Sequence, residues 1–251
     1  MNQKEVIDYI NDFLSIEKFH DHGPNGLQVE GDNREVKKIC LGVSVSEELI
    51  QKAIEIESDL ILTHHGMIWD KDPRIVQGPL RRKLKLLLDN GIAAAAYHFP
   101  LDFHPVLGNN AQLAQKLELS DIRPFTVIAN CGEGVIGNTS LGHINELSDF
   151  IEKVLGRRPL VLPFGPLSIS KVAILTGGAQ SHFLKAIEAG ADCYITGEVS
   201  EPNYTMSKEY RVHFVSAGHY ATERFGIKAL GLHVSGQLGI RCDYLEIDNP
   251  V

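Results

Sequence analysis

Short apolar runs alternate with amphipathic stretches along much of the chain. Residues 38–43 form one apolar run, residues 46–57 place apolar side chains at helical spacing, and residues 59–66 contain a second run. A strand, a helix and another strand in this order are typical of a mainly parallel α/β sheet. The second run, Leu60-Ile-Leu62, carries no charge, which predicts a strand covered on both faces.

The same pattern returns later in the sequence. Residues 38–64 align without a gap with residues 171–197, and both segments contain Lys-Ala-Ile-Glu followed by an aspartate and a threonine. Residues 92–102 likewise match residues 213–223, and each of these segments ends in a histidine, three further residues and a carboxylate. We infer an internal duplication from these matches.

The duplication predicts two related α/β lobes, residues 1–125 and residues 126–251, with a cleft between them. Sheets of this kind bind ligands beyond the carboxyl ends of their strands. If the lobes face each other, the side chains at these strand ends converge in the cleft. Those side chains are His64, His65, His98, Asp102, Glu198, His219 and Glu223.

Imidazole nitrogens and carboxylate oxygens at these strand ends predict a metal site. They are the usual ligands of zinc, manganese and iron, and a carboxylate can bridge two ions. Adjacent histidines at a strand end point in different directions, so His64 and His65 suit two neighbouring ions better than one. His219 and Glu223, four residues apart, share a helical face if a helix begins there. For the His64-His65 dipeptide alone, a pair of ordinary loop histidines is the alternative.

Composition narrows the cellular setting. With 43% hydrophobic and 22% charged residues, the chain is typical of soluble globular proteins. No window approaches the roughly 18 apolar residues of a spanning helix, and no apolar leader precedes the first helical pattern. We expect a cytoplasmic protein that does not bind a membrane. The net charge of −8 argues against nucleic acid as a partner. The scattered cysteines predict buried thiols rather than disulfides; they are Cys40, Cys131, Cys193 and Cys242.

Several short motifs, each unspecific alone, occur together across the chain. They are Asn25-Gly-Leu-Gln-Val-Glu-Gly31, Leu62-Thr-His-His-Gly66, Leu101-Asp-Phe-His-Pro105, Thr196-Gly-Glu198 and Gly218-His-Tyr-Ala-Thr-Glu-Arg224. In combination the sequence resembles the dinuclear-metal-centre protein family, whose bacterial members are often named type 2 GTP cyclohydrolase I homologues. It looks closest to the short bacterial YbgI-like members, over essentially its whole length.

The resemblance implies two divalent metal ions per subunit, of zinc, manganese or iron, and a toroidal homohexamer. The ligands that it implies are His64, His65, Asp102, His219 and Glu223, with Glu223 as the bridge. His98 is not carried over as a ligand. We assign His98 and Glu198 to proton transfer as catalytic candidates, and an ordinary packed histidine is the alternative for His98.

Two neighbouring metal ions can generate hydroxide near neutral pH and hold an anionic substrate oxygen. A metal-dependent hydrolase is therefore the first functional hypothesis. The family name implies a nucleotide or a related phosphorylated compound as substrate, with GTP cyclohydrolase chemistry as one form, although the sequence has no P-loop. Three basic residues are candidates to orient phosphate, with ordinary surface charge as the alternative: Arg74, Arg224 and Lys228.

The alternative function is non-enzymatic. A ring-forming protein that binds or delivers metal, or that regulates other proteins, would carry the same ligands. The sequence does not choose between an enzyme and this alternative, and it does not identify a substrate.

Overall fold

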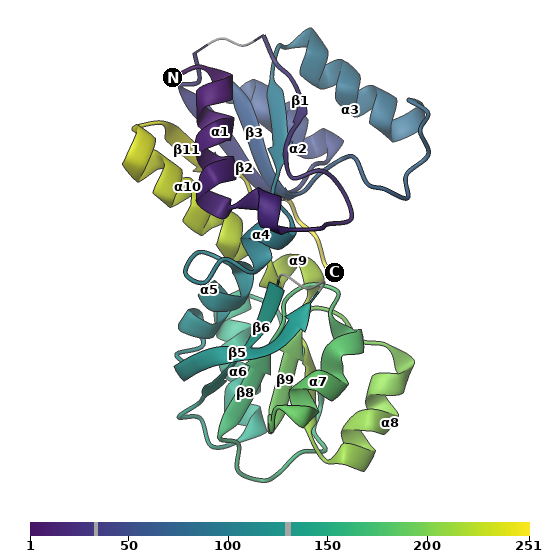
Figure 1. The fold of residues 1–251 in the computed structure, drawn as a ribbon. Coiled ribbons are helices and arrows are strands. Elements are labelled where there is room, and N and C mark those ends of the chain that lie inside the picture. The colour runs from purple at the N-terminus through teal and green to yellow at the C-terminus, as the bar shows by residue number, and fades with distance from the viewer. Residues whose placement is uncertain (33–34, 129–131) are drawn as a thin grey trace. The chain divides into compact units, whose positions relative to one another are not determined.

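The computed structural model describes residues 1–32, 35–128 and 132–251, which form two compact units (Figure 1). The first unit comprises Met1–His104 and Gly226–Asp248, and the second comprises Pro105–Phe225 and Asn249–Val251. These units differ from the predicted lobes because the chain returns to the first unit near its end. There the strand β11 (Arg241–Tyr244) pairs in parallel with β2 (Lys38–Ser44).

The first unit is a five-stranded sheet with helices on both faces. Its strand order is β1-β4-β3-β2-β11, and only β1 runs antiparallel to its neighbour. Helices α1 and α10 pack on one face of this sheet, while α2 and α3 pack on the other (Figure 1). The remaining elements are α1 (Gln3–Leu14), η1 (Ile16–Lys18), β1 (Gly26–Val29), α2 (Glu47–Glu55), β3 (Leu60–His65), α3 (Gly78–Asp89), β4 (Ala93–Ala96), α4 (Phe99–Asp102) and α10 (Arg224–Leu238).

The second unit is built in the same way on a six-stranded sheet of order β5-β6-β8-β9-β10-β7. Strands β8, β9 and β10 are parallel, and the other strands pair antiparallel. Its elements are α5 (Asn109–Lys116), β5 (Ser120–Ile128), β6 (Gly132–Asn138), α6 (Ile144–Leu155), β7 (Leu160–Leu162), β8 (Lys171–Ile174), η2 (Gln180–His182), α7 (Phe183–Glu188), β9 (Cys193–Thr196), α8 (Glu201–Tyr210), β10 (His213–Ser216) and α9 (His219–Thr222).

The predicted α/β fold is confirmed, and β3 shows why its apolar run is uninterrupted. Leu60 and Leu62 pack into the core beneath α1, whereas Ile61 points into the core beneath α2. All three side chains are fully buried. A strand covered on both faces cannot alternate apolar with polar residues, because neither face reaches water.

The two units repeat one order of elements. In the first, β1-β4-β3-β2 form consecutive strands of the sheet, and in the second β7-β10-β9-β8 do the same. An aspartate before the second parallel strand also has one role in both units. Asp59 accepts hydrogen bonds from the amides of residues 37 and 38, and Asp192 accepts them from residues 170 and 171. This recurrence supports the duplication, which stays an inference from one chain.

Two further expectations concern membranes and thiols. Among the helices in the described ranges, none is long and apolar enough to cross a membrane. Cys40 and Cys193 are buried free thiols, and Cys242 is a partly buried one. The expectation for Cys131 lies outside the described residues.

We predict that Asp59→Ala and Asp192→Ala each lower the free energy of unfolding by about 1–3 kcal/mol, because each leaves two backbone N–H groups without their acceptor. Urea unfolding measures the change. Asp149→Ala, at an exposed position of α6, is the control and should change stability by no more than about 0.5 kcal/mol. Equal stabilities for all three variants would contradict the shared role of the aspartates.

Candidate metal centre

The carboxyl ends of the parallel strands in the first unit carry a cluster of histidines. His64 and His65 are the last two residues of β3, and His98 follows β4 two residues after that strand ends. The candidate ligand atoms of these three histidines all lie within 4.8 Å of one another. Adjacent parallel strands bring their ends to one edge of a sheet, so the β3–β4 pairing itself assembles this cluster.

Each histidine in the cluster has its Nδ1 atom held by an oxygen. His64 Nδ1 donates to the carbonyl of Tyr97 at 3.0 Å, and His65 Nδ1 is hydrogen-bonded to Ser44 Oγ at 2.9 Å. His98 Nδ1 lies 2.7 Å from a carboxylate oxygen of Asp21. A neutral histidine that donates through Nδ1 keeps its lone pair on Nε2. Histidines that bind metal ions through Nε2 are usually held in this way.

Asp102 adds a carboxylate to this cluster. It ends α4, the single helical turn after His98, and its side chain is buried. Its Oδ1 atom lies 3.5 Å from Nε2 of the fully buried His64. The two atoms that would ligate an ion therefore face the same point.

Asp21 is the residue behind His98, and no sequence motif pointed to it. Its side chain is 2% exposed and also accepts hydrogen bonds from Asn25 Nδ2 and the backbone amide of Phe99. Burial alone would raise the pKa of Asp21, but these hydrogen bonds and the His98 charge outweigh it and lower the pKa to about 2. Asp21 is thus a fixed negative charge that orients His98.

The second unit repeats this arrangement at the end of β10. His219 Nδ1 lies 2.7 Å from Glu198 Oε1, and His219 Nε2 lies 3.2 Å from Glu223 Oε2. Glu223 is 3% exposed, whereas Glu198 is partly exposed. Burial lowers the pKa of His219, but the hydrogen bonds and charges of Glu223 and Glu198 outweigh it and raise the pKa to about 9. A metal ion at Nε2 would take the place of that proton.

Two glycines make room for these side chains. A Cβ atom on Gly177 would lie 2.0 Å from Glu223 Oε1, and one on Gly197 would lie 2.5 Å from the Cα atom of His219. Gly177 also has a positive φ of 69°. Its amide donates to Thr222 Oγ1 at 3.1 Å, so this turn is a structural one and its amide is engaged within the protein.

Comparison with known proteins identifies the family of the chain. The model of the family described as Duf34/NIF3 (NGG1p interacting factor 3) matches residues 1–250. The chain belongs to this family. A Haemophilus influenzae relative named GTP cyclohydrolase 1 type 2 homolog is 43% identical, with 100% of both chains covered.

Two solved structures resemble the whole chain. One is protein ybgI, described as of unknown function, with a TM-score of 0.95 and 38% identity. The other is TTHA1606 from Thermus thermophilus, with a TM-score of 0.92 and 32% identity. Both matches cover 100% of this chain and 100% of the solved structure. The NIF3 fold accordingly spans both units of the chain.

The donor set of this NIF3-family chain fits a divalent transition-metal ion. Imidazole nitrogens and carboxylate oxygens suit zinc, manganese and iron, and the oxygens on Nδ1 fix the ring orientations. The histidine cluster of the first unit and the His219–Glu223 pair of the second are therefore both groups that could bind metal ions.

The structure shows the contacts of several residues with predicted roles. His98 is predicted for proton transfer, and its candidate ligand atom lies within 4.8 Å of those of the other two cluster histidines. Glu198, also predicted for proton transfer, holds His219. Arg224 donates to the carbonyl of Leu155, and Lys228 pairs with Glu246 at 3.6 Å. These two basic side chains have local partners, which favours an ordinary structural role over phosphate binding.

We predict that Asp21→Asn lowers the free energy of unfolding by about 2 kcal/mol at pH 7, because the pKa of Asp21 is lowered from 3.8 to about 2. A carboxyl group whose pKa is lower in the folded than in the unfolded protein contributes stability at pH values above its unfolded pKa. This contribution is lost as the pH falls through its folded pKa. The difference from wild type should therefore shrink between about pH 4 and pH 2. Chemical unfolding across this range measures it, and a pH-independent difference would contradict the assignment.

We predict that Glu198→Gln weakens metal binding by about 10- to 100-fold, because it removes the charge that holds His219 Nδ1. Competition with a chromogenic chelator measures the dissociation constant. Glu201→Gln, at the exposed start of α8, is the matched control and should bind metal as wild type does. Equal metal affinities of the Glu198 variant and wild type would contradict a role for Glu198 in metal binding.

Proposed function

We propose that the protein is a metal-dependent hydrolase acting on a nucleotide or a related phosphorylated compound. The observation that carries the proposal is the set of histidines whose Nδ1 atoms are each held by an oxygen, at the strand ends of both units. Packing alone does not require this uniform orientation. It is the arrangement that metal ligands need.

Named side chains have defined parts in this proposal. The residues that would hold two divalent ions are His64, His65, Asp102, His219 and Glu223. The bound ions supply Lewis acidity, which activates water near neutral pH and stabilises an anionic oxygen. His98, oriented by Asp21, would give or accept a proton at Nε2. Glu198 would position His219 through Nδ1.

The substrate class rests on the family. Its relatives carry the name GTP cyclohydrolase 1 type 2 homolog, and we propose a nucleotide or a similar phosphorylated compound on that basis. The cytoplasmic location, expected from the composition, and the toroidal homohexamer, implied by the family resemblance, stay proposals. Sedimentation equilibrium tests the assembly, for which we predict six times the chain mass of 27.7 kDa.

The central experiment compares metal content with turnover. We predict that wild-type protein loaded with zinc, manganese or iron cleaves at least one compound in a panel of nucleotides and phosphoesters. His65→Ala should lower both bound metal and turnover without unfolding the protein, because it removes a ligand at the end of β3. His22→Ala, in the exposed loop before β1, is the control and should retain both properties.

The alternative function predicts another result. A metal-binding or metal-delivering protein would lose metal with His65→Ala but would cleave none of the compounds with any of the three metals. That outcome would reject the hydrolase and retain the metal centre. Full metal content in both His65→Ala and Glu223→Ala would reject the centre itself.

A further inference from the structure

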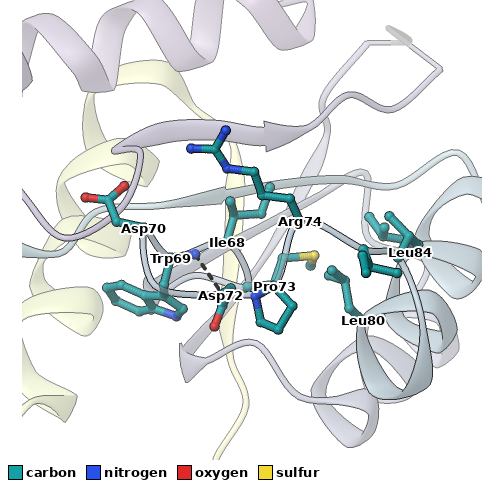
Figure 2. A pocket seen from close by; sticks show the side chains of 11 residues that line it. Ile68, Trp69, Asp70, Asp72, Pro73, Arg74, Leu80 and Leu84 are labelled. Atoms are coloured by element: carbon teal, nitrogen blue, oxygen red, sulfur yellow. Dashed lines mark hydrogen bonds between the residues drawn. The ribbon is translucent and has the colours of Figure 1, made fainter.

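A pocket opens beside the histidine cluster, within the first unit. The loop between β3 and α3 encloses about 520 Å³ together with the first turns of α3. This volume lies within the range of small-molecule sites. Figure 2 shows Leu80 and Leu84 reaching from α3 toward the loop that carries Trp69 and Pro73. The rest of the apolar lining consists of Met67, Ile68, Ile75 and Val76.

Hydrogen bonds fix the loop that forms the pocket. The amide of Met67 donates to Gln28 Oε1 at 2.9 Å, and the amide of Asp70 donates to the carbonyl of His22 at 2.8 Å. Asp72 Oδ2 accepts from the amide of Trp69 at 3.1 Å. The first two bonds tie Met67 and Asp70 to β1 and to the segment before it, so this part of the lining is held in place without a ligand.

Trp69 connects this pocket with the candidate metal ligands. Trp69 is one of the residues that line the pocket, and its ring meets the His98 ring edge to face, with the ring centroids 5.2 Å apart and an interplanar angle of 88°. The His65 ring lies 6.2 Å away. A ligand that contacts Trp69 would therefore be separated from His65 and His98 by no more than the Trp69 side chain.

The lining combines apolar side chains with charged ones, and this combination suits a flat ring with polar edges. Trp69 and the thioether of Met67 are surfaces on which an aromatic ring packs well. Asp70, Asp72 and Arg74 add both signs of charge to the same lining. Such groups can pair with the N–H and carbonyl groups of a heterocycle, and an aliphatic chain has no groups to pair with them.

We propose that this pocket binds the aromatic heterocycle of the substrate and so presents the rest of the molecule to the histidine cluster. The proposal rests on the proposed function for the identity of the ligand as a nucleotide-like compound. It adds the place where the base is held and the residues that select it.

Trp69 provides a direct readout, because it is the single tryptophan of the chain. We expect guanosine or adenosine to change its fluorescence saturably, and ribose 5-phosphate, which lacks the ring, to leave it unchanged. Leu84→Phe extends a larger side chain into the pocket and should weaken nucleoside binding by at least about tenfold. Leu88→Phe, one turn along α3 at an exposed position outside the lining, is the matched control and should bind as wild type.

The outcomes separate this proposal from the proposed function. Nucleoside binding that Leu84→Phe abolishes, without turnover of any compound, would support the pocket and reject the hydrolase. Turnover of a nucleotide with the same KM in Leu84→Phe and wild type would reject the pocket and retain the hydrolase. The pocket proposal is also overturned if the fluorescence responds to octanoate but not to either nucleoside, or if both phenylalanine variants respond as wild type does.

Discussion

The candidate centre depends on one repeated constraint, an oxygen atom that holds Nδ1 of each histidine. The four oxygens are chemically different: a backbone carbonyl, a serine hydroxyl, an aspartate and a glutamate. In each ring the contact at Nδ1 leaves Nε2 as the candidate atom, for metal ligation in His64, His65 and His219 and for proton transfer in His98. Without these partners each ring would rotate, and a ligand set would need to be ordered at the moment of binding. The protein has already met that entropic cost in folding.

The sheets explain where this constraint can operate. Parallel strands bring their carboxyl ends to one edge, where the backbone leaves regular pairing and side chains of neighbouring strands approach one another. In both units a single helical turn follows the third parallel strand, and a histidine and a carboxylate lie at or beside its ends. The close approach of these side chains to the backbone also requires glycine. At Gly177, for example, a Cβ atom would collide with the Glu223 carboxylate. The chemistry therefore depends on the backbone as much as on the ligands.

The features that could be predicted from the sequence are those that repeat along the chain or lie in one continuous stretch of it. The apolar run of β3, the order of strands and helices, and the aspartates at 59 and 192 could all be found from local pattern. Asp21 and Ser44 could not, because each meets its histidine only after the chain has folded, at sequence separations of 77 and 21 residues. Glu198 was found as a candidate, but its role depends on which imidazole nitrogen it contacts. The pocket around Trp69 arises from a loop without periodicity, and its second wall comes from α3.

X-ray absorption at the metal edge of zinc-loaded protein tests the central claim most directly, because it reports the atoms around the ion. The account predicts a first shell of nitrogen and oxygen at about 2.0–2.1 Å with the multiple scattering of imidazole rings, and a weaker imidazole signal in His65→Ala. A shell of oxygen alone, or an imidazole signal that is identical in His65→Ala and wild type, would contradict it.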